Sequence, residues 1–410
     1  MLVKVVEKGA TMKQIKIYAD ILEDEALKQF NDAMKLKCNE AGALMSDAHS
    51  GYTLPIGAVV RSKNMIFPAY VGYDIGCGMC AVKLDLRADE LDLERVKDEI
   101  LREIPVGIFK HLKPQEFANL PKCTEMALNL FSEIGAFQLG TLGSGNHFIE
   151  IGKDKASQIW VVVHSGSRGF GKSIAEFYMK LACEKSINIA EFDAEFEAKN
   201  AEFKKHNPSK FEIAKQEFVK KSLQKAVKSN LEGHYGFELN SKEARDYILD
   251  MNCAMEFALK NRKIMIEKIK QILGNPKELF FINKHHNHAV ISDDGFVLHR
   301  KGATSADRGE YGVIPGNMRD GSFIVRGLGN ENSLCSSSHG AGRVLSRAKA
   351  RATLSMDEFF ESMKGIVTNH TENMLDEAPK AYKDIFEVMK SQSDLVEIVE
   401  HIKPILNVKG

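Results

Sequence analysis

The sequence predicts a single α+β domain of mixed sheets over residues 1–410, with a helical insertion at about residues 190–273. Short strand patterns alternate with turn-forming residues, and no internal repeat or low-complexity linker divides the chain. Length alone would allow two or three domains. However, glycine-rich runs that carry candidate metal ligands are spread from residue 74 to residue 339. They can form one loop-built site for two metal ions only if they converge within a single domain.

The first elements follow from regular hydrophobic periods. Val82, Leu84 and Leu86 alternate with polar residues, which is the period of a half-buried strand. Residues 89–104 carry one apolar stripe and end before Pro105, which predicts a helix. A mixed strand and helix pattern is therefore present from the start of the chain.

The middle of the chain predicts a buried strand followed by helices. Residues 159–163 form a continuous apolar run, typical of a strand buried on both faces, and it ends at His164. Ligand groups often lie at the carboxyl ends of such strands. Residues 174–182 have an amphipathic helical pattern. Residues 190–273 are helical in pattern and rich in Lys and Glu, without a glycine-rich run, so we interpret them as an insertion with a solvated charged face.

The last part of the chain is richer in loops. Residues 289–299 predict a hairpin around Asp293-Asp294-Gly295. Residues 303–342 are dense in Gly, Ser and Asn and include one short strand at 323–326. Ser355 lies three residues before Glu358, the spacing of a capping box at the start of a helix.

Composition excludes several classes of protein. The formal net charge is zero, so a nucleic-acid surface would have to be a local patch, and basic residues do gather between 300 and 351. No window approaches the roughly 18 apolar residues of a membrane span, and the N-terminus is too charged for a signal peptide. The seven cysteines are scattered and odd in number, which argues against a secreted disulfide framework. We therefore expect a cytoplasmic protein that does not bind membranes.

Cys77 is the strongest single candidate for a metal ligand. It lies between two glycines in Asp74-Ile-Gly-Cys77-Gly-Met, so bare backbone lets the thiolate approach a metal or bridge two ions. Asp74 adds an oxygen donor. Cys77 and Cys80 also spell C-x-x-C, which would suit a redox pair or half a zinc site. No second C-x-x-C exists, and Cys80 opens an apolar strand, so a core position is favoured for it.

Three histidines in tight turns complete a set of five donors. His147, His164 and His286 each lie near glycine or asparagine. A lone histidine is more often a hydrogen-bonded structural residue. With Asp74 and Cys77, however, the set suits two cations that share a thiolate and keep open positions. Mixed S, N and O donors fit Mn²⁺ or Zn²⁺ better than Mg²⁺.

His339 lies in surroundings that suit phosphate. Gly340-Ala-Gly342 could turn amide groups toward an anion, and Arg343 and Arg347 follow. An imidazole beside such a loop can be a nucleophile toward an activated phosphoryl group. Two alternatives are a helix-start histidine that makes a cap and a Cys335-x-x-x-His metal pair.

A second motif predicts a different chemistry. Residues Gly166 to Ser173 satisfy G-x-x-x-x-G-K-[ST] between a predicted strand and a predicted helix, so a P-loop NTPase centred on Lys172 is a rival. No apolar strand ending in an Asp for magnesium is evident, and the P-loop would leave the Cys and His runs unexplained. His164-Ser-Gly-Ser-Arg lacks the spacing of a serine nucleophile elbow.

Together the runs resemble the signature segments of the RtcB RNA ligases. The similarity covers residue 40 to the end and is weakest in the helical insertion. The segments are Asp47-Ala-His49-Ser-Gly-Tyr-Thr-Leu-Pro55-Ile-Gly, Val71-Gly-Tyr-Asp74-Ile-Gly-Cys77-Gly-Met, Leu139-Gly-Thr-Leu-Gly-Ser-Gly-Asn146-His147-Phe-Ile-Glu150, His164-Ser-Gly-Ser-Arg168-Gly, Ser338-His339-Gly-Ala-Gly-Arg343 and Val408-Lys409-Gly410.

The resemblance implies a GTP- and Mn²⁺-dependent ligase. It would join RNA ends with a 2′,3′-cyclic phosphate or 3′-phosphate to 5′-hydroxyl ends, in RNA repair or tRNA splicing. It implies one metal on Asp74, Cys77 and His147 and a second on Cys77, His164 and His286. His339 would carry GMP, and Arg168 would contact RNA phosphate. The implied guanylate pocket comprises Asn146, His147, Glu150, His286, Asn287, Pro315, Gly316, Asn317, Met318, Ser322, His339, Gly340, Ala341, Gly342 and Lys409.

Two segments depart from the family's pattern. Asn317 stands where the family usually has Ser, and Asp47-Ala-His differs from the commoner Asp-Val-His. Asn317 still offers donors and an acceptor, so we expect altered nucleotide contacts and retained activity. A non-catalytic metal-dependent RNA-binding protein is the second rival. The physiological RNA, the oligomeric state and the need for an activating protein partner stay open.

Overall fold

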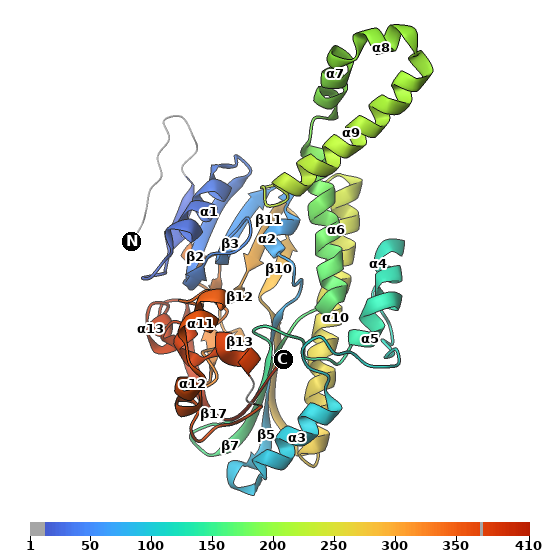
Figure 1. Ribbon diagram of the computed structural model, residues 1–410. Coiled ribbons are helices and arrows are strands. Elements are labelled where there is room, and N and C mark those ends of the chain that lie inside the picture. Colours follow the sequence, from blue (N-terminus) through green and yellow to red (C-terminus); the bar gives the residue numbers. More distant parts are fainter. Residues whose placement is uncertain (1–12, 370–371) are drawn as a thin grey trace.

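A large mixed sheet forms the centre of the molecule (Figure 1). The structure, a computed structural model, describes residues 13–369 and 372–410. The eight-stranded sheet has the order β13-β14-β17-β6-β7-β5-β9, with β16 paired to β17. Its strands are β5 (Gly78–Arg87), β6 (Phe148–Lys153), β7 (Gln158–Ser165), β9 (Glu278–His285), β13 (Tyr311–Pro315), β14 (Ser322–Gly327), β16 (Val367–Thr368) and β17 (Val396–Lys409).

A second sheet of five strands has the order β1-β2-β3-β11-β10. Its strands are β1 (Gln14–Ile17), β2 (Asn39–His49), β3 (Ile56–Lys63), β10 (Asn287–Ile291) and β11 (Phe296–Lys301). Two small ladders pair β4 (Met65–Ile66) with β8 (Phe237–Glu238) and β12 (Ala303–Ser305) with β15 (Ser336–Ser338). Parallel and antiparallel pairs occur together in both large sheets, which confirms the predicted mixed α+β class.

His286 lies at the corner where the chain leaves the large sheet for the small one. β9 ends at His285 and β10 begins at Asn287. The His286 amide donates to the carbonyl of Cys77 over 2.8 Å, and its carbonyl accepts from Ala303 over 3.1 Å. The two sheets therefore meet at a predicted metal ligand.

Two long helices lie side by side, and the second of them packs on the large sheet (Figure 1). They are α6 (Arg168–Ser186) and α10 (Lys242–Ile272). Met265, Ile266 and Ile269 of α10 are buried against Val161 and Val163 of β7. Each such side chain contributes roughly 1.5–3 kcal/mol when removed from water. α10 is thus a core helix although it lies within the range predicted as an insertion.

Only the first part of that range projects from the body. α7 (Ile189–Lys199), α8 (Ala201–His206) and α9 (Pro208–Asn230) form an arm that extends away from the sheets (Figure 1). Phe196, Phe203, Phe211 and Phe218 hold the arm together through ring contacts. The pattern of Lys and Glu could not distinguish this arm from α10, because both are amphipathic helices.

Shorter elements surround the two sheets. They are α1 (Asp24–Lys35), α2 (Pro68–Val71), η1 (Ala88–Glu90), α3 (Leu93–Glu103), α4 (Glu125–Leu130), η2 (Phe131–Gly135), α5 (Ala136–Gln138), η3 (Glu331–Ser333), α11 (Arg347–Thr353), α12 (Met356–Ser362), η4 (Glu372–Glu377), η5 (Pro379–Ala381) and α13 (Ile385–Lys390). No helix in the described part of the chain is long and apolar enough to cross a membrane.

Most predicted elements are confirmed, with shifted ends. The hairpin forms between β10 and β11, and Ser355 and Glu358 make the expected capping box of α12. The helix predicted over 89–104 begins only at Leu93, because the Asp92 side chain caps it by accepting from the amide of Arg95 over 3.1 Å.

Candidate active site

The five predicted metal ligands come together from four parts of the fold. Asp74 and Cys77 lie in the loop before β5, His147 precedes β6, His164 lies at the end of β7, and His286 lies between β9 and β10. The side chains of Cys77, His147, His164 and His286 are almost fully buried. The loops at neighbouring strand ends therefore build one compact cluster.

Cys77 lies at the middle of this cluster. Its Sγ is 3.5 Å from Nε2 of His147 and 3.3 Å from Nε2 of His164. Nε2 of His147 is 3.1 Å from an Asp74 carboxylate oxygen, and Nε2 of His164 is 3.3 Å from Nε2 of His286. The sulfur is therefore placed to bridge an aspartate side and a histidine side of the cluster.

The hydrogen-bond pattern of the cluster suits a cation. Nδ1 of His147 lies 3.0 Å from the carbonyl of Leu142, and Nδ1 of His164 lies 3.1 Å from that of Asn146. A carbonyl can only accept, so each Nδ1 carries the proton and each Nε2 presents a lone pair. Buried lone pairs that face a sulfur and one another need a positive centre between them. Among the described residues, Cys77, His147 and His164 form a group whose ligand atoms all lie within 4.8 Å of one another.

Burial sets the protonation states in the same direction. It lowers the pKa of His164 and of His286 well below the usual value, so both are neutral, which is the metal-binding form. Burial, reinforced by the Asp74 charge, raises the pKa of the Cys77 thiol. A thiolate at this position therefore requires a neighbouring cation, because metal coordination deprotonates a thiol outright.

Arg262 of α10 ties the ligand loops together and was missed from the sequence. It is fully buried, and Nη1 donates to the carbonyls of Gly76 over 2.9 Å and Ser165 over 2.8 Å. These residues adjoin Cys77 and His164. Nothing in the sequence distinguishes this arginine from the solvated charges of an amphipathic helix.

Asp47 positions the imidazole of His339. The Asp47 carboxylate is fully buried, and Oδ2 lies 2.6 Å from Nδ1 of His339. The same oxygen accepts from the amides of His339 and Gly340 over 3.2 and 3.3 Å. The carboxylate lies against Nδ1 and would favour a proton there, which would leave the lone pair on Nε2. The His339 and His286 rings are 4.7 Å apart between centroids, which places His339 against the cluster.

The loop after His339 packs against Asp47. The amide of Gly340 donates to the Asp47 carboxylate over 3.3 Å, so this one amide of the loop is already committed to a protein group. Gly342 has φ of 74°, and a Cβ there would lie 2.1 Å from the Asp47 carbonyl oxygen. Glycine is therefore required by close packing against Asp47. His339 directly follows β15 and the next helix, α11, begins only at Arg347, so the helix-cap alternative for His339 is wrong.

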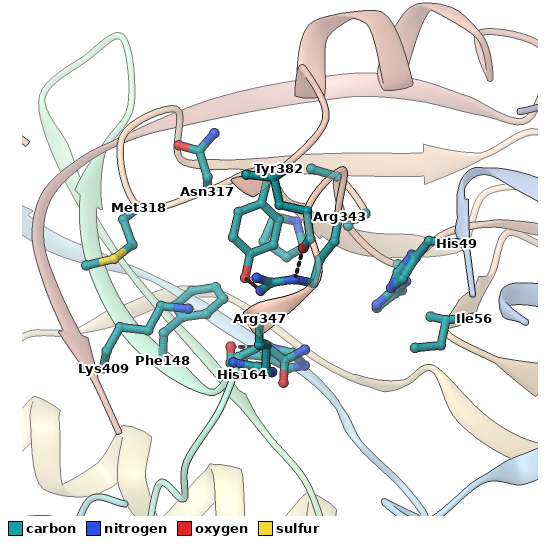
Figure 2. A pocket seen from close by; sticks show the side chains of 18 of the residues that line it. His49, Ile56, Phe148, His164, Asn317, Met318, Arg343, Arg347, Tyr382 and Lys409 are labelled. Atoms are coloured by element: carbon teal, nitrogen blue, oxygen red, sulfur yellow. Dashed lines mark hydrogen bonds between the residues drawn. The ribbon is translucent and has the colours of Figure 1, made fainter. Parts of the chain in front are cut away.

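A cavity of about 560 Å³ opens beside His339, a volume suited to a small organic ligand (Figure 2). The predicted guanylate residues that line it are Asn146, Glu150, Pro315, Gly316, Asn317, Met318, His339, Gly340, Ala341, Gly342 and Lys409. Further lining residues that the sequence did not single out for this pocket include Phe148, Arg343, Arg347, Tyr382 and Asn407.

Four other predicted pocket residues are not among those that line this cavity. His147 and His286 belong to the cluster. Asn287 is held by the backbone: its side chain donates to the Asp74 carbonyl over 3.1 Å and accepts from Gly302 over 2.7 Å. The Ser322 hydroxyl lies beside Glu150, where it lowers the pKa of that carboxyl.

One wall of the cavity carries a buried carboxyl and a cationic network. Burial raises the pKa of Glu150 to about 8, against the opposing effects of Ser322 and Lys409. Nζ of Lys409 is 2.7 Å from Glu377, whose carboxylate also holds Arg343 at 3.1 Å and Arg347 at 2.5 Å. Figure 2 shows Lys409 beside Phe148 on one side of the cavity.

Asn317 and Arg168 direct their polar groups into the protein. Asn317 accepts from the amides of Arg319 and Asp320 over 3.0 Å each and donates to the Asp320 carboxylate over 2.7 Å. Its side chain stabilises its own turn while it lines the cavity. Arg168 donates to Thr141 over 3.2 Å and to the Gly107 carbonyl over 3.3 Å.

The other sequence motifs do not form sites. Arg168 to Ser173 are the first turns of α6, and Lys172 faces outward 3.5 Å from Glu176, so no P-loop exists. The seven cysteines are free. Cys80 is fully buried in the core, and burial raises its pKa to about 12. Cys335 lines a different cavity from His339.

The fold and the site define a protein that is built around a buried Cys–His cluster beside a nucleotide-sized cavity. The model of a family described as tRNA-splicing ligase RtcB matches residues 29–129 and 125–410. The RNA-splicing ligase RtcB of Escherichia coli K12 is 34% identical over 401 residues, which cover 90% of each chain. The tRNA-splicing ligase RtcB of Nanoarchaeum equitans is 28% identical over 98% of this chain and 97% of its own. The chain therefore belongs to the RtcB family of RNA-splicing ligases, which confirms the resemblance.

Proposed function

We propose that the protein is a GTP- and Mn²⁺-dependent ligase that joins RNA 2′,3′-cyclic phosphate or 3′-phosphate ends to 5′-hydroxyl ends. Membership of the family supports the ligase activity and an RNA substrate, in repair or in tRNA splicing. The observation that carries the mechanism is the position of His339. It is oriented by Asp47 and lies between the metal-ligand cluster and the larger cavity.

Guanine suits the inner wall of the cavity. Its Watson–Crick edge presents N–H donors and the O6 acceptor. Glu150 in its ionised form accepts the N–H groups, and the Lys409 ammonium donates to O6. The two residues belong to neighbouring strands, and the Lys409 charge acts on Glu150. Arg343 and Arg347 are the cationic side chains that face the rest of the nucleotide.

His339 then acts as the nucleophile. Nε2 attacks the α-phosphorus of GTP, an N–P bond forms, and the bond to the β-phosphate oxygen breaks to release pyrophosphate. Asp47 stabilises the positive charge that develops on the imidazole by holding the Nδ1 proton. A cyclic phosphate is opened by water to a 3′-phosphate before the next transfer.

Two further transfers complete the joining. An oxygen of the RNA 3′-phosphate attacks the phosphorus of the GMP on His339, the N–P bond breaks, and RNA-3′-pp-5′-G forms. The 5′-hydroxyl oxygen of the second RNA then attacks the 3′-phosphorus, and GMP leaves with the bridging oxygen. Activation is needed because a 3′-phosphate alone is a poor electrophile.

The cluster residues fit the metal ions of this reaction. Asp74, Cys77 and His147 would hold one Mn²⁺, and Cys77, His164 and His286 the other, since Sγ lies between the two groups of donors. When bound, the ions would neutralise the crowded phosphates and favour ionisation of the attacking hydroxyl.

A denaturing gel with α-labelled GTP and Mn²⁺ tests this proposal. We expect covalent label on the wild type and on Lys172→Ala, and none on His339→Ala. Lys172 is a matched control because it is exposed on α6 and does not line the cavity. A wild type that binds metal yet takes no label would favour a non-catalytic metal-dependent RNA-binding protein.

A further inference from the structure

Glu377 holds four residues that line the nucleotide-sized cavity, although it does not line that cavity itself. It is buried at the end of η4. Its Oε1 accepts from Arg343 over 3.1 Å and from Arg347 over 2.5 Å. Its Oε2 accepts from Lys409 over 2.7 Å and from the hydroxyl of Tyr382. One carboxylate therefore links the lysine and arginine side chains that line this cavity.

The Glu377 carboxylate has no acceptor site left for a ligand. A carboxylate offers about four acceptor sites on its two oxygens, and four donors already occupy them. Burial favours the neutral form, but the charges of Lys409 and Arg347 outweigh this effect and lower the pKa of Glu377 to about 2. The group is therefore ionised in neutral solution and acts on a nucleotide only through the side chains that it holds.

Lys409 depends on Glu377 more than the two arginines do. Arg347 also donates to the carboxylate of Asp376 over 2.6 Å, and Arg343 also donates to the Asp376 carbonyl over 2.5 Å. Among the residues that the structure describes, Nζ of Lys409 donates to Glu377 alone. Loss of the Glu377 charge would therefore release the lysine and leave the arginines attached.

Lys409 is also within reach of Glu150. In the ladder between β17 and β6, Lys409 lies opposite Phe148 and Asn407 lies opposite Glu150. Lys409 and Glu150 are thus diagonal neighbours on one face of the sheet, and long side chains can meet across such a diagonal. The ammonium lies against Glu377 instead, and Oε1 of Glu150 has no hydrogen-bond partner in the described part of the chain. Two carboxylates therefore compete for one lysine.

The outcome of this competition decides whether guanine can be read. Guanine needs an unpaired carboxylate for its N–H groups and an ammonium for O6. An ion pair between Lys409 and Glu150 would occupy the carboxylate, and the base would have to break a buried pair to bind. Because an ammonium has three N–H groups, Lys409 can keep its bond to Glu377 and still donate to O6.

We propose that Glu377 is a positioning residue for guanine recognition, which holds the Lys409 ammonium apart from Glu150 so that both groups face the base. This inference rests on the proposed function, since it names what keeps the two base-reading groups of that reaction separate. Glu377 contacts neither the base nor the reacting phosphorus. Its effect is on the affinity for guanine and not on the transfer of GMP to His339.

Calorimetry with GTP and with inorganic tripolyphosphate, both without Mn²⁺, tests the inference. The ratio of the two affinities reports the contribution of the guanosine, because both ligands carry a triphosphate. Glu377→Gln keeps the shape of the side chain and removes its charge. At a pH above the pKa of Glu150, we expect this ratio to fall about tenfold in the variant, the effect of losing one charge-assisted hydrogen bond.

The pH profile of GTP binding supplies a readout that a purely structural role would not change. In the wild type the affinity should rise as Glu150 ionises, because burial raises its pKa to about 8. Ser322 and Lys409 are the other groups that act on this carboxyl. In Glu377→Gln the released ammonium should pair with Glu150 and lower its pKa, so the rise should move by at least about one pH unit toward acid.

Asp376→Asn is the matched control. Asp376 is the adjacent buried carboxylate, and it holds Arg347 and Arg351 but not Lys409. Its affinity ratio should match that of the wild type within about twofold, and its pH profile should not move. In a Lys409→Met background, Glu377→Gln should change the ratio no further, because the lysine that it positions is gone.

The outcomes separate this inference from the proposed function. An unchanged ratio and an unchanged pH profile in folded Glu377→Gln would overturn the inference. Equal losses of affinity for GTP and tripolyphosphate would also overturn it, because Glu377 would then support the cavity as a whole. If Glu377→Gln does not fold, the same ratio is measured in Glu377→Gln/Arg343→Met, which removes one charge of each sign from the network. A wild type that takes no label from α-labelled GTP would refute the ligase mechanism, and the affinity ratios would still decide the role of Glu377.

Discussion

The Asp47 carboxylate and the His339 imidazole are joined at 2.6 Å between Oδ2 and Nδ1, and the carboxylate is completely enclosed by protein. The same oxygen receives two backbone amides of the loop that carries His339. One buried carboxylate thus holds the loop in place and lies directly against the imidazole that the loop carries.

We therefore expect Asp47→Asn to slow guanylylation of His339 by about 10²- to 10⁴-fold. The amide can donate to Nδ1 and so favours the tautomer with the proton on Nε2, where the lone pair is needed. Initial rates of labelling with α-labelled GTP measure this. Metal content and melting temperature should stay near wild-type values, and a rate within threefold of wild type would contradict the assigned role.

Cys77→Ala should abolish the sulfur-to-metal charge-transfer absorption that appears when Co²⁺ is added as a probe. The reason is that Sγ is the shared donor between His147 and His164. Cys80→Ala, three residues along the chain and buried in the core, is the matched control and should keep the band. Retention of the band in Cys77→Ala would show that sulfur is not a ligand.

GTP affinity should rise with pH between about 6 and 8, by up to tenfold per unit. Burial raises the pKa of Glu150 to about 8, so the carboxyl is neutral at lower pH and cannot accept both guanine N–H groups. Calorimetry without Mn²⁺ separates binding from chemistry. Glu150→Gln should bind more weakly at pH 8 and show a flat profile; an unchanged slope in this variant would assign the titration to another group.

The same carboxyl should affect stability with a defined sign. Because its pKa is raised in the folded state, the folded protein holds a proton that the unfolded chain loses above about pH 4.5. The contribution of this carboxyl to folding stability is fully present below that pH and is lost as the pH rises to about 8. Across this pH window the free energy of unfolding of Glu150→Gln, measured with urea, should therefore rise relative to that of the wild type. The relative gain should be at most about 5 kcal/mol.

Arg262→Ala should destabilise the protein by at least about 3 kcal/mol and weaken metal binding. The substitution removes a buried donor from the carbonyls of Gly76 and Ser165 and from the Asn283 side chain, and it leaves a cavity. Urea unfolding followed by the fluorescence of Trp160 measures the first effect. Lys263→Ala changes the exposed neighbour and should lie within about 0.5 kcal/mol of wild type. Equal stability of the two variants would contradict the structural role of Arg262.

The sequence was informative where glycine-rich turns hold a reactive side chain. Cys77, His147, His164 and His286 could be predicted as a group because each lies in a short run whose composition suits a ligand and not a helix face. Strands and helices with clear periods, such as β7 and α6, were predicted for the same reason: the burial pattern is local.

Long-range partners could not be predicted. Asp47 reaches His339 across 292 residues, and no local pattern marks a carboxylate for such a contact. Arg262 looks like a solvated residue of an amphipathic helix until α10 is packed on the sheet. Asn317 lines the cavity, but the sequence could not show that its short amide side chain also bonds to its own turn, because composition does not resolve such local competition.

The placement of β17 links nucleotide recognition to the assembly of the protein. This strand forms late in the chain yet separates β14 from β6 in the interior of the large sheet, and it delivers Lys409 to the cavity. A ribosome-bound intermediate that lacks it would have neither a continuous sheet nor a base-binding wall. On the proposed function, the capacity to bind a guanine nucleotide should therefore emerge only when β17 closes the sheet.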